Sequence, residues 1–442
     1  MNDKKQIFGW AMYDWANSAY VTTVTVAVLP IFFSSVVVGE GGYEIFGTRY
    51  DAQSLWGFMM SFSALWMFIF APVLGAISDF SASKKKFLMV FCYTGSLFSI
   101  LLFFSGSGDV MRTMLFFIIA QIGFIGGNVF YDAFLPQIAS EDRIDWISGK
   151  GFAYGYVGGG LQFAISLGII AGHDVIGISQ SLAARISIAM AGLWWAGFSV
   201  ITFFKLKEVE AHEQIPLTYR SLPRVLAYAK IGIDRTIGTA KKVGKFKHLT
   251  IFLVAFMVYN DGIQTVINMA TIYGTGELKL PAWVLMVTLL IIQIIALFGA
   301  LIFGKLAGKT TAKKALMLTL FMWSFVVVYA YFMTSAREYF ILGIIVGISM
   351  GGSQALSRSL YGAMIPTQAS AEFYGFYSVF DKFSSIWGPA LFAVKKHVSG
   401  SSRSAIISLI IFFVFGLIIL SLVNVEKAKE AKYSPLFIKN TV

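Results

Sequence analysis

Apolar runs long enough to cross a lipid bilayer follow one another through almost the whole chain of 442 residues. A helix needs about 20 predominantly apolar residues to cross the hydrocarbon core, and several runs exceed that length. Only helices and closed barrels can pair every backbone polar group inside a bilayer. Because the sequence lacks the alternating pattern of barrel strands, it predicts an all-α polytopic membrane protein.

Twelve membrane spans are predicted, six on each side of a long polar segment. We expect an N-terminal half at 1–205, a basic linker at 206–246 and a C-terminal half at 247–442. The expected spans are 8–38, 54–78, 87–106, 112–137, 148–172, 183–205, 247–273, 281–306, 314–335, 339–366, 373–395 and 403–425.

Composition agrees with a membrane protein. Only 13% of the residues are charged and 57% are hydrophobic, whereas a soluble chain carries about 25% charged residues. The net charge of +12 lies mainly in loops on one side, which the positive-inside rule explains without a nucleic-acid partner. This bias predicts a multi-pass protein of the cell (inner) membrane with both termini in the cytoplasm. The first apolar run is too long for a signal peptide, and the single cysteine, Cys92, excludes an internal disulfide.

The linker is strongly basic and has an apolar face. Segment 205–247 holds ten Lys or Arg against four Asp or Glu. Its apolar residues recur at helical spacing, which is typical of an amphipathic helix on the anionic inner leaflet; they are Leu222, Leu226, Ala229, Ile233 and Ile237. The alternative is a plain tether between the halves, and we expect tethering to be its main role.

Two motifs recur at about half the chain length. NVFYDAFLP at 128–136 is related to RSLYGAMIP at 358–366, and both read Tyr-x-Ala-x-x-Pro. A Gly-x-x-x motif followed by paired lysines starts at Gly75 and again at Gly304. Nearly equal offsets of 230 and 229 positions indicate two related halves, as in many transporters.

Polar residues form stripes on the first helix of each predicted three-helix unit, namely spans 1, 4, 7 and 10. Residues three and four positions apart share a helix face, so four such faces predict a central solute path between the halves. The candidate residues are Asp14 and Asn17; Gln121, Asn128, Tyr131 and Asp132; Asn260, Asp261, Gln264 and Asn268; and Gln354, Ser357, Arg358 and Tyr361.

Charged residues inside membrane helices need a specific reason because each costs about 2.5–3.5 kcal/mol at the helix centre. Asp261 is the favoured proton- or substrate-binding carboxylate, and Asp14 either shares that role or bonds a neighbouring helix. Arg358 requires an anion; we expect a contact with Asp132 across the halves, formed in one access state, either as a structural pair or at a substrate site.

Other features favour structural explanations. Asp381 and Lys382 are expected to pair locally or to reach the membrane surface. Glycines such as Gly155 and Gly158 permit close helix packing, and the run GYVGGG lacks the strand and lysine of a nucleotide site. The sequence shows no metal-ligand spacing and no catalytic constellation, so we expect no metal, no cofactor and no enzymatic activity.

The loop after span 2 resembles a signature of the major facilitator superfamily. Gly75 and Asp79 are followed by Lys84, Lys85 and Lys86. The resemblance implies that Asp79 and the lysines latch the halves together in one access state. The second copy has Gly308 in place of the aspartate, so only Asp79 inherits that role.

Within that superfamily, the chain resembles the autophagy-related vacuole-effluxer family and its bacterial relatives from the first helix to the eleventh. The strings that carry the resemblance are YDWANS at 13–18, YNDG at 259–262, QALSRS at 354–359 and AEFYG at 371–375, with Lys382 and Gly388-Pro389. Fungal members are associated with amino-acid export from the vacuole, which makes amino acids the leading substrate class.

The expected function is therefore secondary active transport by alternating access, coupled to protons, that exports amino acids or related small metabolites. One alternative is the export of drugs or lipid-like amphiphiles, suggested by 16% aromatic residues. The other is a membrane scaffold or sensor that transports nothing. Expected partners are a small-molecule substrate, protons and the bilayer, and we expect a monomer.

Overall fold

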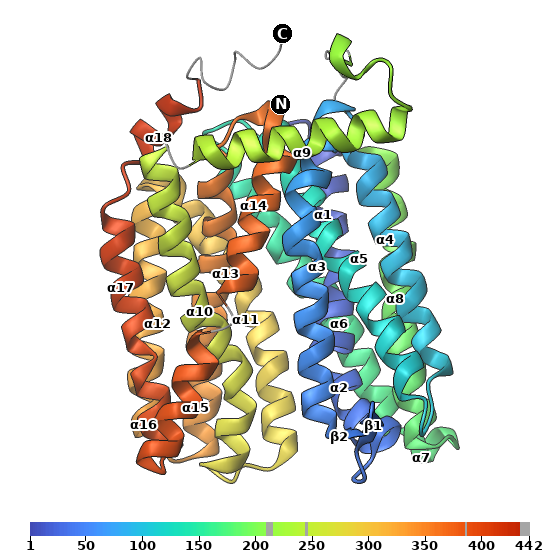
Figure 1. Ribbon diagram of the computed structural model, residues 1–442. Helices are drawn as coiled ribbons and strands as arrows, with labels where there is room; N and C mark the ends of the chain where they lie inside the picture. The colour runs from blue at the N-terminus through green and yellow to red at the C-terminus, as the bar shows by residue number, and fades with distance from the viewer. Residues whose placement is uncertain (209–214, 244–245, 385–386, 434–442) are drawn as a thin grey trace.

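The computed structural model describes residues 1–208, 215–243, 246–384 and 387–433 (Figure 1). Within these residues, eleven helices are long and apolar enough to cross a membrane. They are Lys4–Val38, Ala52–Phe80, Lys84–Phe104, Val110–Ile138, Ile144–Ala171, Gln180–Lys205, Lys247–Ala270, Trp283–Lys309, Ala312–Phe332, Ala336–Met364 and Ser402–Ser421. Each coincides with a predicted span, which leaves only the predicted span 373–395 without a counterpart of full length.

The N-terminal half is helical apart from one hairpin. The first span alternates α-helix with π-helix. The elements are α1 (Lys4–Ala19), η1 (Tyr20–Ala27), α2 (Val28–Phe32), η2 (Phe33–Val38), β1 (Tyr43–Ile45), β2 (Thr48–Tyr50), α3 (Ala52–Phe80), α4 (Lys84–Leu101), η3 (Leu102–Phe104), α5 (Val110–Ile138), α6 (Ile144–Ala171), α7 (His173–Ile176) and α8 (Gln180–Lys205). The strands pair antiparallel, and positive φ angles at Phe46 and Gly47 form the tight turn between them.

The linker and the C-terminal half contain the remaining helices. These are η4 (Leu217–Tyr219), α9 (Arg224–Val243), α10 (Lys247–Gly276), α11 (Ala282–Lys309), α12 (Ala312–Phe332), α13 (Ala336–Met364), η5 (Thr367–Ala369), α14 (Ser370–Phe383), α15 (Trp387–Ser399), α16 (Ser402–Ser408), α17 (Ile410–Ser421) and α18 (Val425–Ala431). Figure 1 shows the two halves side by side, with the N-terminus, α9 and α18 at the same end of the bundle. We call this the N-terminal end.

Short polar side chains fix where several long helices begin. Asp51 accepts the N–H of Ser54 at the start of α3, and Thr311 accepts that of Lys314 at the start of α12. Ser335 forms a reciprocal capping box with Glu338 at the start of α13. These bonds satisfy donors that have no partner in the first helical turn.

The predicted span 373–395 is not one helix in the described residues, and its residues 385–386 lie outside them. The chain instead forms α14, which ends at Phe383, and α15, which begins at Trp387. Pro389 is the third residue of α15; proline lacks the N–H of an interior helical position but fits the first turn of a new helix. The sequence before Trp387 is polar, reading DKFSS at 381–385, but the prediction placed it inside one span with the apolar residues on both sides.

Glycines bring helices into contact within and between the halves. A Cβ at Gly158 of α6 would overlap the backbone of Trp15 in α1, and one at Gly351 of α13 would overlap Ala296 in α11. Between the halves, α3 packs on α14 and α6 packs on α11. Close backbone approach supplies the van der Waals contact that stabilises helix pairs in a bilayer.

The linker helix α9 packs on α3 of the N-terminal half. Ala227 and Ile231 are buried there, and Gly232 fits against Ile77. Three residues of the predicted apolar face, Leu226, Ile233 and Ile237, are exposed. Residues 209–214 and 244–245 of the predicted linker lie outside the described residues.

Candidate functional site

A cavity of about 960 Å³ lies between the two halves. Its wall includes residues of α1, α3, α5 and α6 from one half and of α10, α11, α13 and α14 from the other. The predicted residues that line it are Asp14, Asn17, Gln121, Asn128, Asp132, Asn260, Gln264, Asn268, Gln354, Ser357 and Arg358. Tyr131, Asp261 and Tyr361 are not among the lining residues.

The cavity stops well short of the N-terminal end of the bundle. On α1 its wall begins at Asp14, ten residues after Lys4, which corresponds to about 15 Å along the helix. On α13 the wall ends at Arg358, six residues before Met364. At the opposite end it reaches Tyr339, within the first turn of α13. The cavity therefore runs from the middle of the molecule toward the end away from the N-terminus.

Arg358 marks the closed end of the cavity and joins the halves electrostatically. Its Nη1 lies 3.3 Å from Asp14 Oδ2 and 3.2 Å from Asp132 Oδ1. Its Nε and Nη2 donate to the hydroxyl and carbonyl oxygens of Ser148, at 3.0 and 2.9 Å. The expected contact with Asp132 is thus present, and Asp14 is a second carboxylate partner that the prediction did not pair with it.

Aromatic rings surround the Arg358 guanidinium. Its central carbon lies 4.0 Å from the ring centroid of Phe152, 4.8 Å from Trp10 and 5.4 Å from Tyr131. The Tyr131 hydroxyl also donates to Asp14 at 2.9 Å. These contacts hold the arginine in one orientation, and cation–π attraction strengthens when water is excluded.

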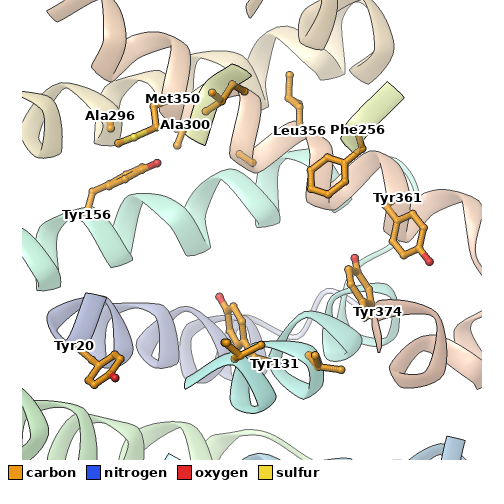
Figure 2. Packing of buried hydrophobic residues seen from close by; sticks show 14 of the residues in the cluster. Tyr20, Tyr131, Tyr156, Phe256, Ala296, Ala300, Met350, Leu356, Tyr361 and Tyr374 are labelled. Atoms are coloured by element: carbon orange, nitrogen blue, oxygen red, sulfur yellow. The ribbon is translucent and has the colours of Figure 1, made fainter. Parts of the chain in front are cut away.

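Side-chain amides of Asn and Gln form hydrogen bonds around the cavity. Asn17 donates to Asn128 at 2.7 Å within the N-terminal half. Two bonds cross between the halves: the Tyr156 hydroxyl donates to Gln354 at 2.6 Å, and Gln293 donates to Thr22 at 3.3 Å. Figure 2 shows Tyr156 directed from α6 toward Met350 of α13.

Asp261 caps a helix, contrary to the expectation that it lines the path. Its carboxylate accepts the backbone N–H groups of Trp387 at 3.0 Å and Gly388 at 2.8 Å, the first residues of α15. A carboxylate at this position satisfies unpaired donors and complements the helix dipole. Its neighbour Asn260 faces the cavity and donates to Asp381 at 3.0 Å and Ser384 at 2.6 Å.

Tyr361 is also a packing residue. Its hydroxyl donates to the Phe373 carbonyl at 2.7 Å, and its ring contacts those of Tyr374 and Tyr377. The hydroxyl of Tyr374 in turn donates to the Arg358 carbonyl at 2.9 Å. Figure 2 shows Tyr361 and Tyr374 beside each other, and Tyr374 also lines the cavity. Tyr361 thus fixes α14 against α13.

The predicted gating residues lie where α3 meets α14. The Asp79 carboxylate accepts the N–H groups of Ala371 and Glu372, at 3.3 and 2.8 Å. It also forms a 2.5 Å ion pair with Lys84, whose Nζ donates to Ser370 at 3.1 Å. At Gly75 a Cβ would overlap the Ala371 backbone. Lys85 contributes differently, because its backbone N–H donates to Glu208 at 2.6 Å.

The second copy of this motif occupies the equivalent place in the other half. A Cβ at Gly304 would lie 3.1 Å from the carbonyl oxygen of Asp145 at the start of α6. Lys305 lies over the Trp146 ring, 5.4 Å from its centroid. A Cβ at Gly308 would point into open space, away from every other described element. The charged latch therefore belongs to the first copy only.

Sequence reasoning missed two charged groups of the cavity wall, Asp381 and Lys382. Both line the cavity, and Lys382 Nζ lies 2.8 Å from Asp381 Oδ2. The local pairing was expected, whereas the location on the wall was not. The available signal was their position in a predicted span, since a charge inside a membrane helix usually faces the bundle interior.

Comparison with known proteins shows the family of this chain. Residues 2–433 match the family described as "Vacuole effluxer Atg22 like". The chain belongs to the Atg22-like effluxer family. It is 36% identical to the MFS-type transporter YxiO of Bacillus subtilis over 428 residues, covering 96% of both chains. It is 24% identical to autophagy-related protein 22 of Kluyveromyces lactis, covering 97% of this chain and 95% of that one.

The fold is that of the major facilitator superfamily. The structure of the proton:xylose symporter XylE superimposes with a TM-score of 0.68 at 14% identity, covering 97% of this chain and 98% of that one. Family and fold together make this Atg22-like protein a polytopic membrane transporter, not an enzyme.

Proposed function

We propose that this Atg22-like transporter exports amino acids or related small metabolites by alternating access, coupled to protons. The observation that carries the proposal is the position of Arg358 between Asp14 and Asp132 at the closed end of the cavity. Two carboxylates facing one guanidinium leave one negative charge in excess. Because an uncompensated buried charge is costly, one proton bound to the pair stabilises the closed arrangement.

The same contact links protonation to movement of the halves. Arg358 belongs to the C-terminal half, whereas Asp14 and Asp132 belong to the N-terminal half. Opening the N-terminal end separates the arginine from both carboxylates and changes their affinity for protons. Proton binding and the access state therefore depend on each other, which is the requirement for coupled transport.

The cavity wall suits small polar solutes that carry both charges. It presents carboxylates, cations and several carboxamides among apolar side chains. With the N-terminal end in the cytoplasm, as the basic loops favour, the cavity faces the outside of the cell (inner) membrane. Asp79 and Lys84 then form the cytoplasmic latch. The linker helix α9 lies at the inner leaflet with its exposed apolar residues toward lipid. The working unit is a monomer.

Proteoliposomes test this function. Proteoliposomes that contain the purified protein and are loaded with labelled amino acids should release them. An imposed pH gradient should accelerate this release. Asp14→Asn and Asp132→Asn should abolish this acceleration, while exchange of amino acids without a gradient continues. The control Asp109→Asn, at an exposed ion pair, should change neither the acceleration nor the exchange. The proposal fails if no amino acid moves, or if its movement carries no proton flux.

Export of amphiphiles is the second candidate because aromatic side chains form much of the wall; they include Phe68, Phe124, Phe152, Phe163 and Phe256. Under this alternative, dyes and lipid-like cations would be transported in the same vesicles and amino acids would not. A scaffold without transport would retain its activity after Arg358→Gln, which a transporter should not.

A further inference from the structure

The described part of the cavity wall carries two cations, Arg358 and Lys382. The Arg358 side chain is only 4% exposed, and its donors go to Asp14, Asp132 and Ser148. The Lys382 side chain is 32% exposed. A negatively charged solute in the cavity therefore meets Lys382 as the accessible cation.

Lys382 has donors to spare. An ammonium group has three N–H bonds, and the contact with Asp381 at 2.8 Å is the one partner that the described residues give it. The second Asp381 oxygen accepts from Asn260 at 3.0 Å, which fixes the carboxylate beside the lysine. The lysine is thus oriented by Asp381, and two of its N–H groups remain for other partners.

Lys382 lies too deep in the bundle to serve as a surface anchor. Its neighbour Asn260, linked through Asp381, is 13 residues after Lys247, about 20 Å along α10 from the N-terminal end. A lysine stem covers only about 6 Å, so its ammonium stays in the cavity, contrary to the snorkelling alternative. Lys382 is also in the last turn of α14, where the helix dipole favours a cation.

We propose that Lys382 is the anion-binding group of the cavity and takes the carboxylate of the transported solute. This inference rests on the proposed function and names the chemistry of its substrate, a small solute with a free carboxylate and an ammonium group. The ammonium would face Asp132, whose side chain is 18% exposed on the opposite half. Such a solute contacts both halves at once, so its binding favours their closure around it.

Charge balance gives the expected consequence. The described wall holds Asp14, Asp132 and Asp381 against Arg358 and Lys382, and the proton proposed for the Asp14–Asp132 pair balances the one negative charge in excess. Removing the Lys382 charge then leaves the wall with one negative charge in excess, so a carboxylate group is repelled while a neutral amide group is not. Because charge-assisted hydrogen bonds contribute about 1.5–3 kcal/mol, carboxylate affinity should fall about tenfold or more.

The test compares an acid with its amide. Transport and Kd are measured for an amino acid and its primary amide with wild type, Lys382→Gln, Lys382→Arg and the control Lys395→Gln, at an exposed site on α15. Lys382→Gln should lose binding of the acid about tenfold and change that of the amide less than about threefold. Lys382→Arg should retain most acid binding, and Lys395→Gln should match wild type. Equal losses for acid and amide, or no loss for either, would overturn the proposal.

A separate arm distinguishes failure of this inference from failure of amino-acid export. Small monocarboxylates are titrated into the detergent-purified protein and followed by thermal stabilisation. If they stabilise wild type but not Lys382→Gln while labelled amino acids stay untransported, the lysine site stands and amino-acid export fails. If amino acids are transported and Lys382→Gln binds monocarboxylates like wild type, the lysine site fails. Wild type that binds no monocarboxylate and no amino acid also overturns it.

Discussion

The carboxylate of Asp79, in the last turn of α3, accepts the backbone N–H of Glu372 at the start of α14, with 2.8 Å between Oδ2 and nitrogen. The two residues belong to different halves. First-turn N–H groups have no partner within their own helix, and the helix dipole adds attraction for an anion. The bond joins the two halves at their N-terminal end, so we expect it to favour the closed state of that end.

Asp79→Asn should open the N-terminal end more often. The substitution leaves buried Lys84 without its charged partner, and breaking a buried ion pair costs about 3–5 kcal/mol. Spin labels at Arg143→Cys and Lys309→Cys in a Cys92→Ala background would report the distance between the halves. Asp109→Asn, at an exposed pair, is the control. Unchanged distance distributions in Asp79→Asn would show that the latch does not set the access state.

Gly75→Ala should have a similar effect for steric reasons. A methyl group there would lie 2.7 Å from the Glu372 backbone nitrogen, and backbone cannot move aside as a side chain can. Gly57→Ala on the same helix has open space and should stabilise α3 by about 0.5–1 kcal/mol. We expect slower transport and a wider N-terminal end for Gly75→Ala alone. Identical behaviour of the two variants would contradict close packing at Gly75.

Asp261→Asn should weaken α15 without changing proton coupling. An amide retains one oxygen acceptor for the Trp387 and Gly388 N–H groups, so one bond and the charge are lost. The expected loss of stability is about 1–2 kcal/mol, measured by thermal unfolding, with a lower transport rate and an unchanged proton-to-substrate ratio. Asp174→Asn, on an exposed side chain, is the control. If the ratio changed and stability did not, Asp261 would be a proton site after all.

Glu141 should stabilise the closed N-terminal end in a pH-dependent way. Partial burial raises its pKa, but the hydrogen bond and charge of Lys432 outweigh burial, so the pKa is lowered from its ordinary value of 4.5. A lowered pKa gives stability that is present above 4.5 and lost as pH falls through the folded-state value. Because the carboxylate is half-exposed, Glu141→Gln should cost at most about 1 kcal/mol near pH 7.

Thermal unfolding of wild type and Glu141→Gln from pH 7 to pH 3 would measure this difference. The two curves should converge in acid as Glu141 becomes protonated. Glu426→Gln is the matched control, because Glu426 is 79% exposed and its ion pair is with Lys429 in the next turn of its own helix. A difference that persists undiminished at pH 3 would mean that the carboxylate charge is not responsible.

Much of the fold follows from the sequence because a bilayer permits few structures. Long apolar runs had to become helices, and the recurring Tyr-x-Ala-x-x-Pro and Gly-x-x-x motifs indicated two halves. The end of α14 at Phe383 was not found, although the polar run DKFSS at 381–385 and Pro389 both lie within the predicted span. The dipeptide Gly388-Pro389 was the available signal for a helix end, and a span assignment by hydropathy does not use it.

The site was predicted less completely, because a polar residue in a span does not identify its partner. Asp261 was predicted as a proton- or substrate-binding carboxylate, and its partners Trp387 and Gly388, 126 and 127 positions away, could not be read from the sequence. Arg358 required an anion, and Asp132 was found through the repeat, whereas Asp14 lies outside the repeat and was not. Lys382 was expected to pair with Asp381 or to reach the surface, and its place on the cavity wall was not foreseen.

The surroundings of Gly362 differ from those of Asp132, its counterpart in the first copy of the repeated motif. Gly362 occupies the position that Asp132 holds in the first copy, and a Cβ there would lie 2.6 Å from the Tyr374 hydroxyl and 3.4 Å from Pro136. The duplicated motifs therefore meet with no space for a second carboxylate. The tight packing at Gly362 therefore leaves Asp132, in the first copy of the motif, as the copy that meets Arg358.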